Sequence, residues 1–110
     1  MTFDEYQQLA LRTATREDGD KFKASVEKAM GISGEAGEVT DLLKKVLCHG
    51  HKLDKNKLIK ELGDVQWYVA TNAAEYGISL KEIAVTNIEK LRQRYPEGFS
   101  QERSINRLNP

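Results

Sequence analysis

The chain has 110 residues, and its 17 basic side chains balance 17 acidic ones. This length suits a single domain, and the charge balance gives the whole molecule no attraction to a nucleic-acid backbone. One cysteine, Cys48, excludes an intrachain disulfide framework, and no apolar run approaches the roughly 18 residues of a membrane span. The amino terminus does not have the pattern of a signal peptide, so we expect a cytoplasmic protein.

Helix signals begin at the amino terminus. Thr2 followed by Glu5 forms a capping-box pattern and predicts a first helix that fades near residues 16–20. A second helix is expected from about residue 22 to residue 48, ending at Gly50, because glycine is the usual residue at a helix C-terminus.

The second half of the chain repeats this pattern. Asp54 can cap a third helix that continues to Tyr76 and is closed by Gly77. Ser79 precedes a fourth helix, expected over residues 80–94. Four helices joined by short connections predict an all-α, four-helix-bundle-like fold.

We expect residues 1–110 to form one helical domain, with its core at about 22–99. The last residues, 100–110, have the composition of a loose or partner-dependent tail.

Two acidic pairs occupy matching positions on consecutive helices: Glu35-x-x-Glu38 and Glu61-x-x-Asp64. At about 100° per residue, the first member of each pair lies inside the apolar arc of its helix and the second lies at the edge of that arc. Buried carboxylates repel one another unless a cation neutralises them. Because all the candidate ligands are oxygens, the pattern favours Mg²⁺, with Mn²⁺ as a substitute.

An ordinary explanation remains open for the second pair. Lys57 and Lys60 precede Glu61 and Asp64 by four residues, the spacing of surface ion pairs on a helix. The glycines beside the two pairs, Gly37 and Gly63, favour either close approach of the helices or room for a ligand.

The fourth helix carries polar residues along its apolar arc. Asn87 lies within the arc, and Lys90 and Arg94 line its edge, where they could bind a triphosphate or simply face solvent. Trp67 lies off the apolar face of its own helix, which predicts an exposed ring or a contact between subunits.

The two acidic pairs, separated by 22 residues, precede a segment over 87–99 in which Lys90 and Arg94 are followed by Tyr-Pro and Gly-Phe. This combination resembles the MazG-like all-α nucleoside triphosphate pyrophosphohydrolase superfamily over roughly residues 22–99. The resemblance implies hydrolysis of (deoxy)nucleoside triphosphates to monophosphate and pyrophosphate, with a role in nucleotide-pool cleansing, and assembly as a homodimer or homotetramer.

By position, the resemblance implies metal ligation by Glu35, Glu38, Glu61 and Asp64. It also implies that Asn87, Lys90, Arg94 and Tyr68 contact the nucleotide. Among the carboxylates, we select Glu38 as the base that activates the attacking water.

Two other classes of protein share parts of this pattern. A nonenzymatic helical interaction module would carry the acidic pairs as surface features. A di-iron bundle would need Glu-x-x-His motifs, and no histidine stands three residues after a glutamate on these helices. The residues do not indicate which base or sugar is preferred.

Overall fold

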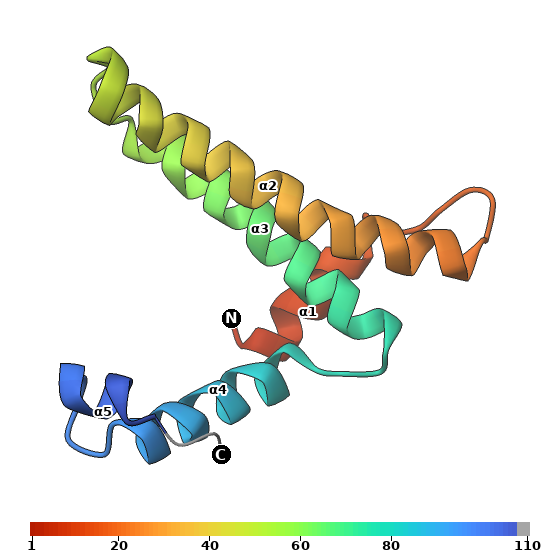
Figure 1. Cartoon of the computed structure of the whole chain (residues 1–110). Coiled ribbons are helices and arrows are strands. Elements are labelled where there is room, and N and C mark those ends of the chain that lie inside the picture. The colour runs from red at the N-terminus through yellow and green to blue at the C-terminus, as the bar shows by residue number, and fades with distance from the viewer. Residues whose placement is uncertain (108–110) are drawn as a thin grey trace.

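The computed structural model describes residues 1–107, which fold into five α-helices (Figure 1). The helices are α1 (Phe3–Leu11), α2 (Lys21–His49), α3 (Lys55–Glu75), α4 (Leu80–Arg94) and α5 (Gln101–Ile105). No β-strand occurs within this range, so the prediction of an all-α fold is confirmed. None of these helices combines the length and apolar character that crossing a membrane requires.

Side-chain caps set the helix starts where the sequence predicts them. The Thr2 hydroxyl accepts the Glu5 N–H at 3.1 Å, and the Ser79 hydroxyl accepts the Glu82 N–H at 3.0 Å. Asp54 caps α3 in the same way. Each cap satisfies backbone donors that have no partner inside the helix.

Glycines stop the two long helices. Gly50, after α2, has a φ of 71°, and Gly77, just beyond α3, has a φ of 68°. Residues with a side chain rarely adopt this left-handed conformation, so both glycines fulfil their predicted role.

The short helix α5 lies within the segment predicted as a tail. The Ser100 hydroxyl accepts the Arg103 N–H at 3.1 Å and begins this helix. The prediction of a loose tail did not anticipate this helix. The last residues of the predicted tail, 108–110, lie outside the described residues.

The helices do not close into a bundle within one chain. Helices α2 and α3 form a long antiparallel hairpin, α1 crosses α3, and α4 runs away from the hairpin (Figure 1). The radius of gyration is 17.1 Å, whereas a compact domain of this length has about 13 Å. The bundle prediction is therefore wrong for a single chain, because the connection after α3 directs α4 away from α2.

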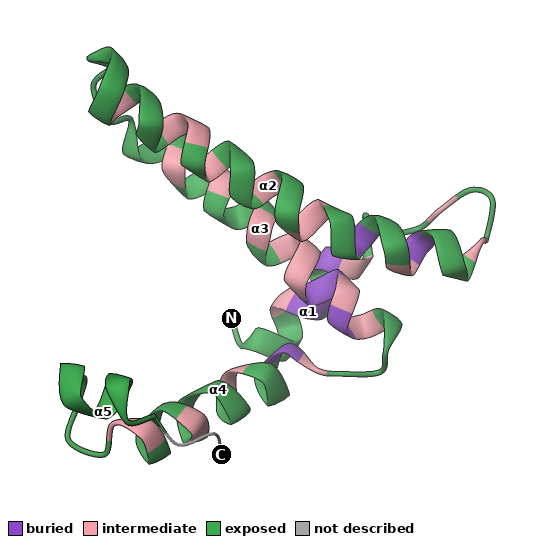
Figure 2. Ribbon diagram, in the orientation of Figure 1, coloured by how far each residue is buried: buried purple, intermediate pink, exposed green. Residues whose placement is uncertain are grey.

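Buried residues gather where α1 crosses the hairpin, a region that we call the junction (Figure 2). Within residues 1–107, eight residues are buried and all of them lie there: Gln7, Ala10, Ala24, Lys28, Ala70, Thr71, Ala73 and Leu80. Between residues 29 and 69 no residue is buried. The core is small, and the outer half of the hairpin contributes nothing to it.

Gln7 connects three helices at the junction. Its amide nitrogen donates to the carbonyl oxygens of Ala70 at 2.9 Å and Ile78 at 3.0 Å. Its amide oxygen accepts the N–H of Leu80 at 3.1 Å. A buried side chain thus bonds to backbone groups of α3, of the connection after it and of the start of α4.

Trp67 packs against α1 within the chain and is half-buried, so the expectation of a fully exposed ring is wrong, whereas the expected contact with another subunit stays a prediction. Its indole N–H is shared between the Thr13 hydroxyl at 2.9 Å and the Ala10 carbonyl oxygen at 3.1 Å. The ammonium of Lys28 lies 5.6 Å from the ring centroid. The ring lies off the apolar arc because it faces α1, a neighbour that the pattern of a single helix does not reveal.

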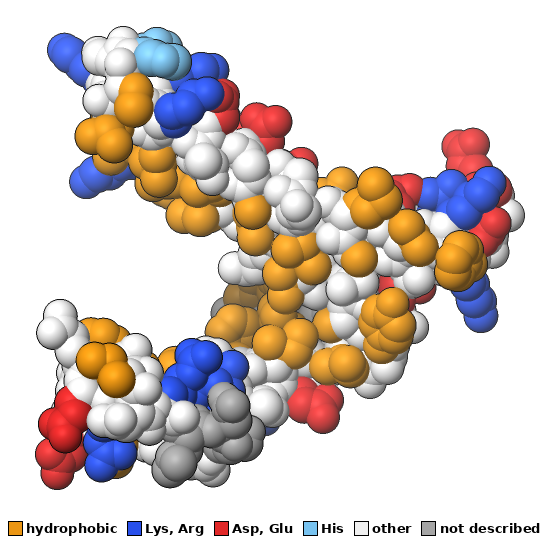
Figure 3. Space-filling view, in the orientation of Figure 1, with side chains coloured by type: hydrophobic (Ala, Val, Ile, Leu, Met, Phe, Trp, Pro, Cys, Tyr) orange, Lys and Arg blue, Asp and Glu red, His pale blue; other side chains and the backbone are white. Residues whose placement is uncertain are grey.

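The chain leaves much apolar surface uncovered. It exposes 8522 Å², whereas a compact monomer of 12.5 kDa exposes about 6,200 Å². Figure 3 shows an open concavity between the hairpin and α4, with hydrophobic side chains along its inner edge. Leu47, Ile59 and Leu62 are among the exposed large side chains of the hairpin.

Candidate metal centre

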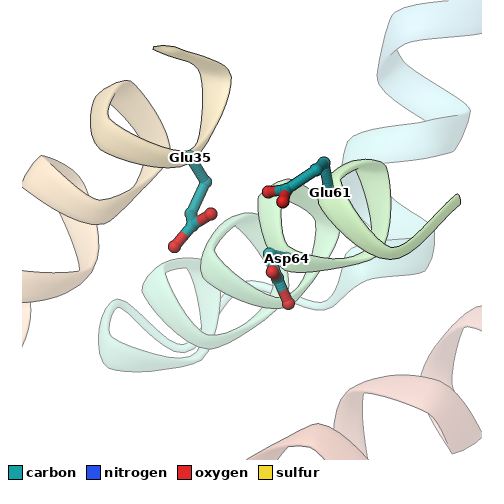
Figure 4. Close-up of side chains that lie close together, drawn as sticks. All are labelled: Glu35, Glu61 and Asp64. Carbon is teal, nitrogen blue, oxygen red and sulfur yellow. The ribbon is translucent and has the colours of Figure 1, made fainter. Parts of the chain in front are cut away.

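Helices α2 and α3 bring three carboxylates together in the middle of the hairpin. Glu35 extends from α2, Glu61 extends from α3 toward it, and Asp64 lies beside them on α3 (Figure 4). Each offers an oxygen within 4.8 Å of the others. Glu61 and Asp64 share a face because they are three residues apart, and the antiparallel pairing places Glu35 opposite them.

Glu38 lies beside this group but is not part of it. It lines a cavity of about 250 Å³ that runs between α2 and α3 toward the hairpin tip, and Glu61 lines the same cavity. Of the four carboxylates predicted to be ligands, the structure therefore gathers three and places the fourth next to them.

No cation neutralises these carboxylates. In the part of the chain that the structure describes, the ion pairs are Arg16 with Asp18 and Glu27, Asp41 with Lys44 and Lys45, and Arg92 with Glu89. None involves Glu35, Glu38, Glu61 or Asp64. The surface ion pairs with Lys57 and Lys60 that the sequence left open are thus not formed.

The electrostatic consequence falls on Glu35. Partial burial raises the pKa of its carboxyl group above the usual value, and the nearby charges of Asp64, Glu61 and Glu38 raise it further. Both causes disfavour the ionised form. A bound cation would favour that form and reverse the effect.

The glycines of α2 and α3 divide into two kinds. A side chain at Gly31 would overlap the ring of Tyr68, so the close helix approach occurs there. Gly37 and Gly63, for which the sequence also allowed close approach, have nothing within 4 Å of an added side-chain carbon. The second option, room beside the carboxylates, fits their surroundings.

Tyr68 lies one turn beyond Asp64 on α3. Its ring packs on Gly31 and meets the Trp67 ring edge-on at a centroid distance of 4.9 Å. Tyr68 is half-buried, so one part of the ring is held by the fold while another part remains accessible.

The predicted substrate-binding residues of α4 lie apart from the carboxylates. Asn87 and Lys90 line a shallow cavity that also borders Ile78. Arg94 lies between α4 and α5, near Arg103. Within one chain, the structure does not bring these three residues to the carboxylate group, because α4 leaves the hairpin.

The sequence missed one further set of charges at the site. Lys52 and Lys57 line the far part of the cavity that contains Glu38 and Glu61. From the sequence, Lys57 is predicted only as a surface ion-pair partner. Its spacing of one turn from Glu61 could have placed it beside the carboxylates. The position of Lys52 depends on the loop between the helices, so no helical spacing predicts it.

The donor chemistry of the three gathered carboxylates fits a hard divalent cation. They offer oxygens only, come from two helices, and are accessible enough for water and phosphate to complete a coordination shell. Mg²⁺ commonly binds in this way, through a few carboxylates plus substrate phosphates.

Comparisons with known proteins agree with this chemistry. A family model described as the MazG nucleotide pyrophosphohydrolase domain matches residues 25–99. The "Gene 37 protein" of Mycobacterium phage L5 is 34% identical over 114 residues, which covers 97% of this chain and 100% of the phage protein. No solved structure matches significantly. The match over most of the chain, which includes both acidic pairs, shows that the protein belongs to the MazG nucleotide pyrophosphohydrolase family.

Proposed function

We propose that the protein hydrolyses nucleoside triphosphates to nucleoside monophosphate and pyrophosphate, with Mg²⁺, or Mn²⁺ in its place, as cofactor. The observation that carries this proposal is the convergence of Glu35, Glu61 and Asp64 from two helices, with no ion pair to any of them among the described residues. Holding three acidic groups together without a counterion is unfavourable, so the arrangement calls for a cation.

Glu35, Glu61 and Asp64 would hold the metal, which supplies positive charge that offsets the charge of the substrate phosphates. Water attacks the α-phosphorus and forms a new P–O bond. The bond from that phosphorus to the oxygen bridging to the β-phosphorus breaks, and pyrophosphate leaves with this oxygen. Glu38, next to the ligands but outside their group, accepts the proton of the attacking water.

The residues of α4 enter the site from a second copy of the chain. Lys90 and Arg94 would bind phosphate oxygens, and Asn87 would bind the sugar or base. Because α4 points away from the carboxylates of its own chain, these contacts require a homodimer or homotetramer in which the partner's α4 approaches the hairpin.

The exposed surface supports such an assembly. The chain exposes roughly 2,300 Å² more than a compact monomer of its mass, and a standard interface buries about 800 Å² per partner. A symmetric assembly would cover the apolar concavity and complete the site together.

The reaction is tested with a panel of canonical and modified nucleoside triphosphates in water labelled with ¹⁸O. We expect metal-dependent release of pyrophosphate, not orthophosphate, with the label found in the nucleoside monophosphate by mass spectrometry. Absence of turnover with both metals, together with no metal-dependent thermal shift, would instead favour a nonenzymatic interaction module.

The shared site is tested by mixing two inactive variants, Asp64→Asn and Arg94→Ala. In a mixed dimer, one site combines intact carboxylates with an intact α4, so a random mixture should regain about a quarter of wild-type activity. Sedimentation of the wild type gives the number of chains in the assembly. An active monomer, or no recovery on mixing, would refute the shared site.

A further inference from the structure

The cavity beside the carboxylates has a defined charge pattern. One end is lined by Glu38 and Glu61, next to the proposed metal centre, and the other end is lined by Lys52 and Lys57 near the hairpin tip. In the part of the chain that the structure describes, neither lysine forms an ion pair. Two ammonium groups thus border the cavity without a counterion.

The other acidic groups of the cavity are already engaged. Asp41 pairs with Lys45 at 3.0 Å and with Lys44 at 3.2 Å. Asp54 accepts the backbone N–H groups of two residues in the first turn of α3. Their charges are partly compensated, so the tip end of the cavity remains suited to an anion.

The order of residues along α3 gives the site a direction. Lys57 lies one turn before Glu61, and Tyr68 lies one turn after Asp64. Cationic, carboxylate and aromatic side chains therefore follow one another along one helix. A nucleoside triphosphate bound to a metal has the same order: terminal phosphates, metal-bound phosphate and nucleoside.

We infer that the cavity is the subsite for the β- and γ-phosphates, bound by Lys52 and Lys57, with the nucleoside directed toward Tyr68. This inference rests on the proposed function and adds the orientation of the substrate. Lysine binds phosphate as a point charge and tolerates several geometries, which suits a group that must leave after cleavage. Because negative charge develops on the departing pyrophosphate, the two lysines would also favour its departure.

The test compares Lys52→Gln, Lys57→Gln and the double variant with two controls, Lys55→Gln and Lys60→Gln. The control lysines lie on α3, as Lys57 does, and do not line the cavity. The readouts are product inhibition by inorganic pyrophosphate and, independently of turnover, the thermal shift that pyrophosphate causes in the presence of Mg²⁺.

We expect the double variant to bind pyrophosphate at least about tenfold more weakly, while the controls stay near wild type. Inhibition by the nucleoside monophosphate should change little, because its phosphate stays at the metal and its nucleoside lies toward Tyr68. If the wild type turns over substrate but the cavity variants bind pyrophosphate as tightly as the control variants, the phosphate subsite is refuted and the proposed function is not. A wild type without turnover would overturn the proposed function and the inference together.

Discussion

The junction and the outer half of the hairpin are built from the same two helices but differ in what completes them. At the junction, Gln7 and Trp67 satisfy backbone groups of neighbouring helices, and every buried residue lies there. In the outer part of the hairpin, residues 29–66, no residue is buried, and the carboxylates form no ion pair within residues 1–107. The junction is complete within one chain, whereas under the proposed function a cation and a second chain would complete the hairpin.

This difference separates stability from function along the sequence. Substitutions at the junction should change the free energy of unfolding, because they remove contacts that are already formed. Substitutions among the carboxylates should change metal binding and turnover while leaving the unliganded fold intact. A substitution that changes both the free energy of unfolding and turnover would show that the two regions are coupled at that residue.

The largest effect is expected at the proposed metal centre. Asp64→Asn should lower turnover by more than about 100-fold and remove the metal-dependent rise in melting temperature. Without metal its melting temperature should not fall, because one of several clustered charges has been removed. Calorimetry with and without Mg²⁺ measures both effects, with Glu89→Gln as a surface control.

The Glu38→Gln variant separates the loss of turnover from the loss of metal binding. It should lose turnover like Asp64→Asn but keep the metal-dependent thermal shift, since Glu38 lies outside the carboxylate group. If either variant unfolds both with and without metal, these carboxylates stabilise the fold. The hairpin would then not differ from the junction in this respect.

At the junction, Gln7→Leu should lower the free energy of unfolding by about 3 kcal/mol. The substitution removes the hydrogen bonds from Gln7 to the carbonyl oxygens of Ala70 and Ile78 and takes away the acceptor of the Leu80 N–H. Urea denaturation at fixed protein concentration measures the change. Gln8→Leu, at the exposed neighbouring position, is the matched control, and an equal loss there would contradict the role of Gln7.

A smaller effect with opposite signs is expected at two glycines of α2. Gly31→Ala should destabilise the fold by about 1–3 kcal/mol, because the added methyl group overlaps the Tyr68 ring. Gly34→Ala should stabilise it by up to about 1 kcal/mol, since alanine favours helix and that position faces open space. Thermal denaturation that gives both variants the same sign would show that the helices do not meet at Gly31.

The smallest effect is expected on the surface before α2. Arg16 donates to Asp18 at 2.7 Å and holds the pKa of that carboxyl well below its usual range. A lowered pKa in the folded state adds stability at neutral pH that is lost only as the solution becomes strongly acidic. Asp18→Asn should therefore slightly lower the free energy of unfolding at pH 7, and this difference from the wild type should disappear in acid or high salt. A large loss of stability at pH 7 would mean that this surface ion pair stabilises the fold as strongly as the buried contacts of the junction do.

Local chemistry made the helices and half of the site predictable. Caps such as Ser79 and stops such as Gly50 act within one turn of the chain, so most helix boundaries could be read directly. The end of the first helix is the exception, because it was expected near residues 16–20 and lies at Leu11. The carboxylates were found for the same reason, because the 3.6-residue period places Glu61 and Asp64 on one face whatever surrounds them.

Contacts between distant segments were not predictable from the pattern. The partner of Trp67 lies 57 residues away at Ala10, and Gln7 reaches Leu80 across 73 residues. Gln7 did stand within the apolar stripe of its helix, and a polar residue there could have drawn attention. The course of α4 depends on a few backbone angles after α3, which no periodicity encodes.

The proposed function depends most directly on the binding of a divalent cation by Glu35, Glu61 and Asp64 together. Titration of the protein with Mn²⁺, followed by the loss of the free-ion signal in electron paramagnetic resonance, tests it directly and requires no substrate. The account predicts saturable binding to the wild type and to Glu38→Gln, and strongly weakened binding to Asp64→Asn and Glu61→Gln. Equal binding to all four proteins, or none to the wild type, would contradict it.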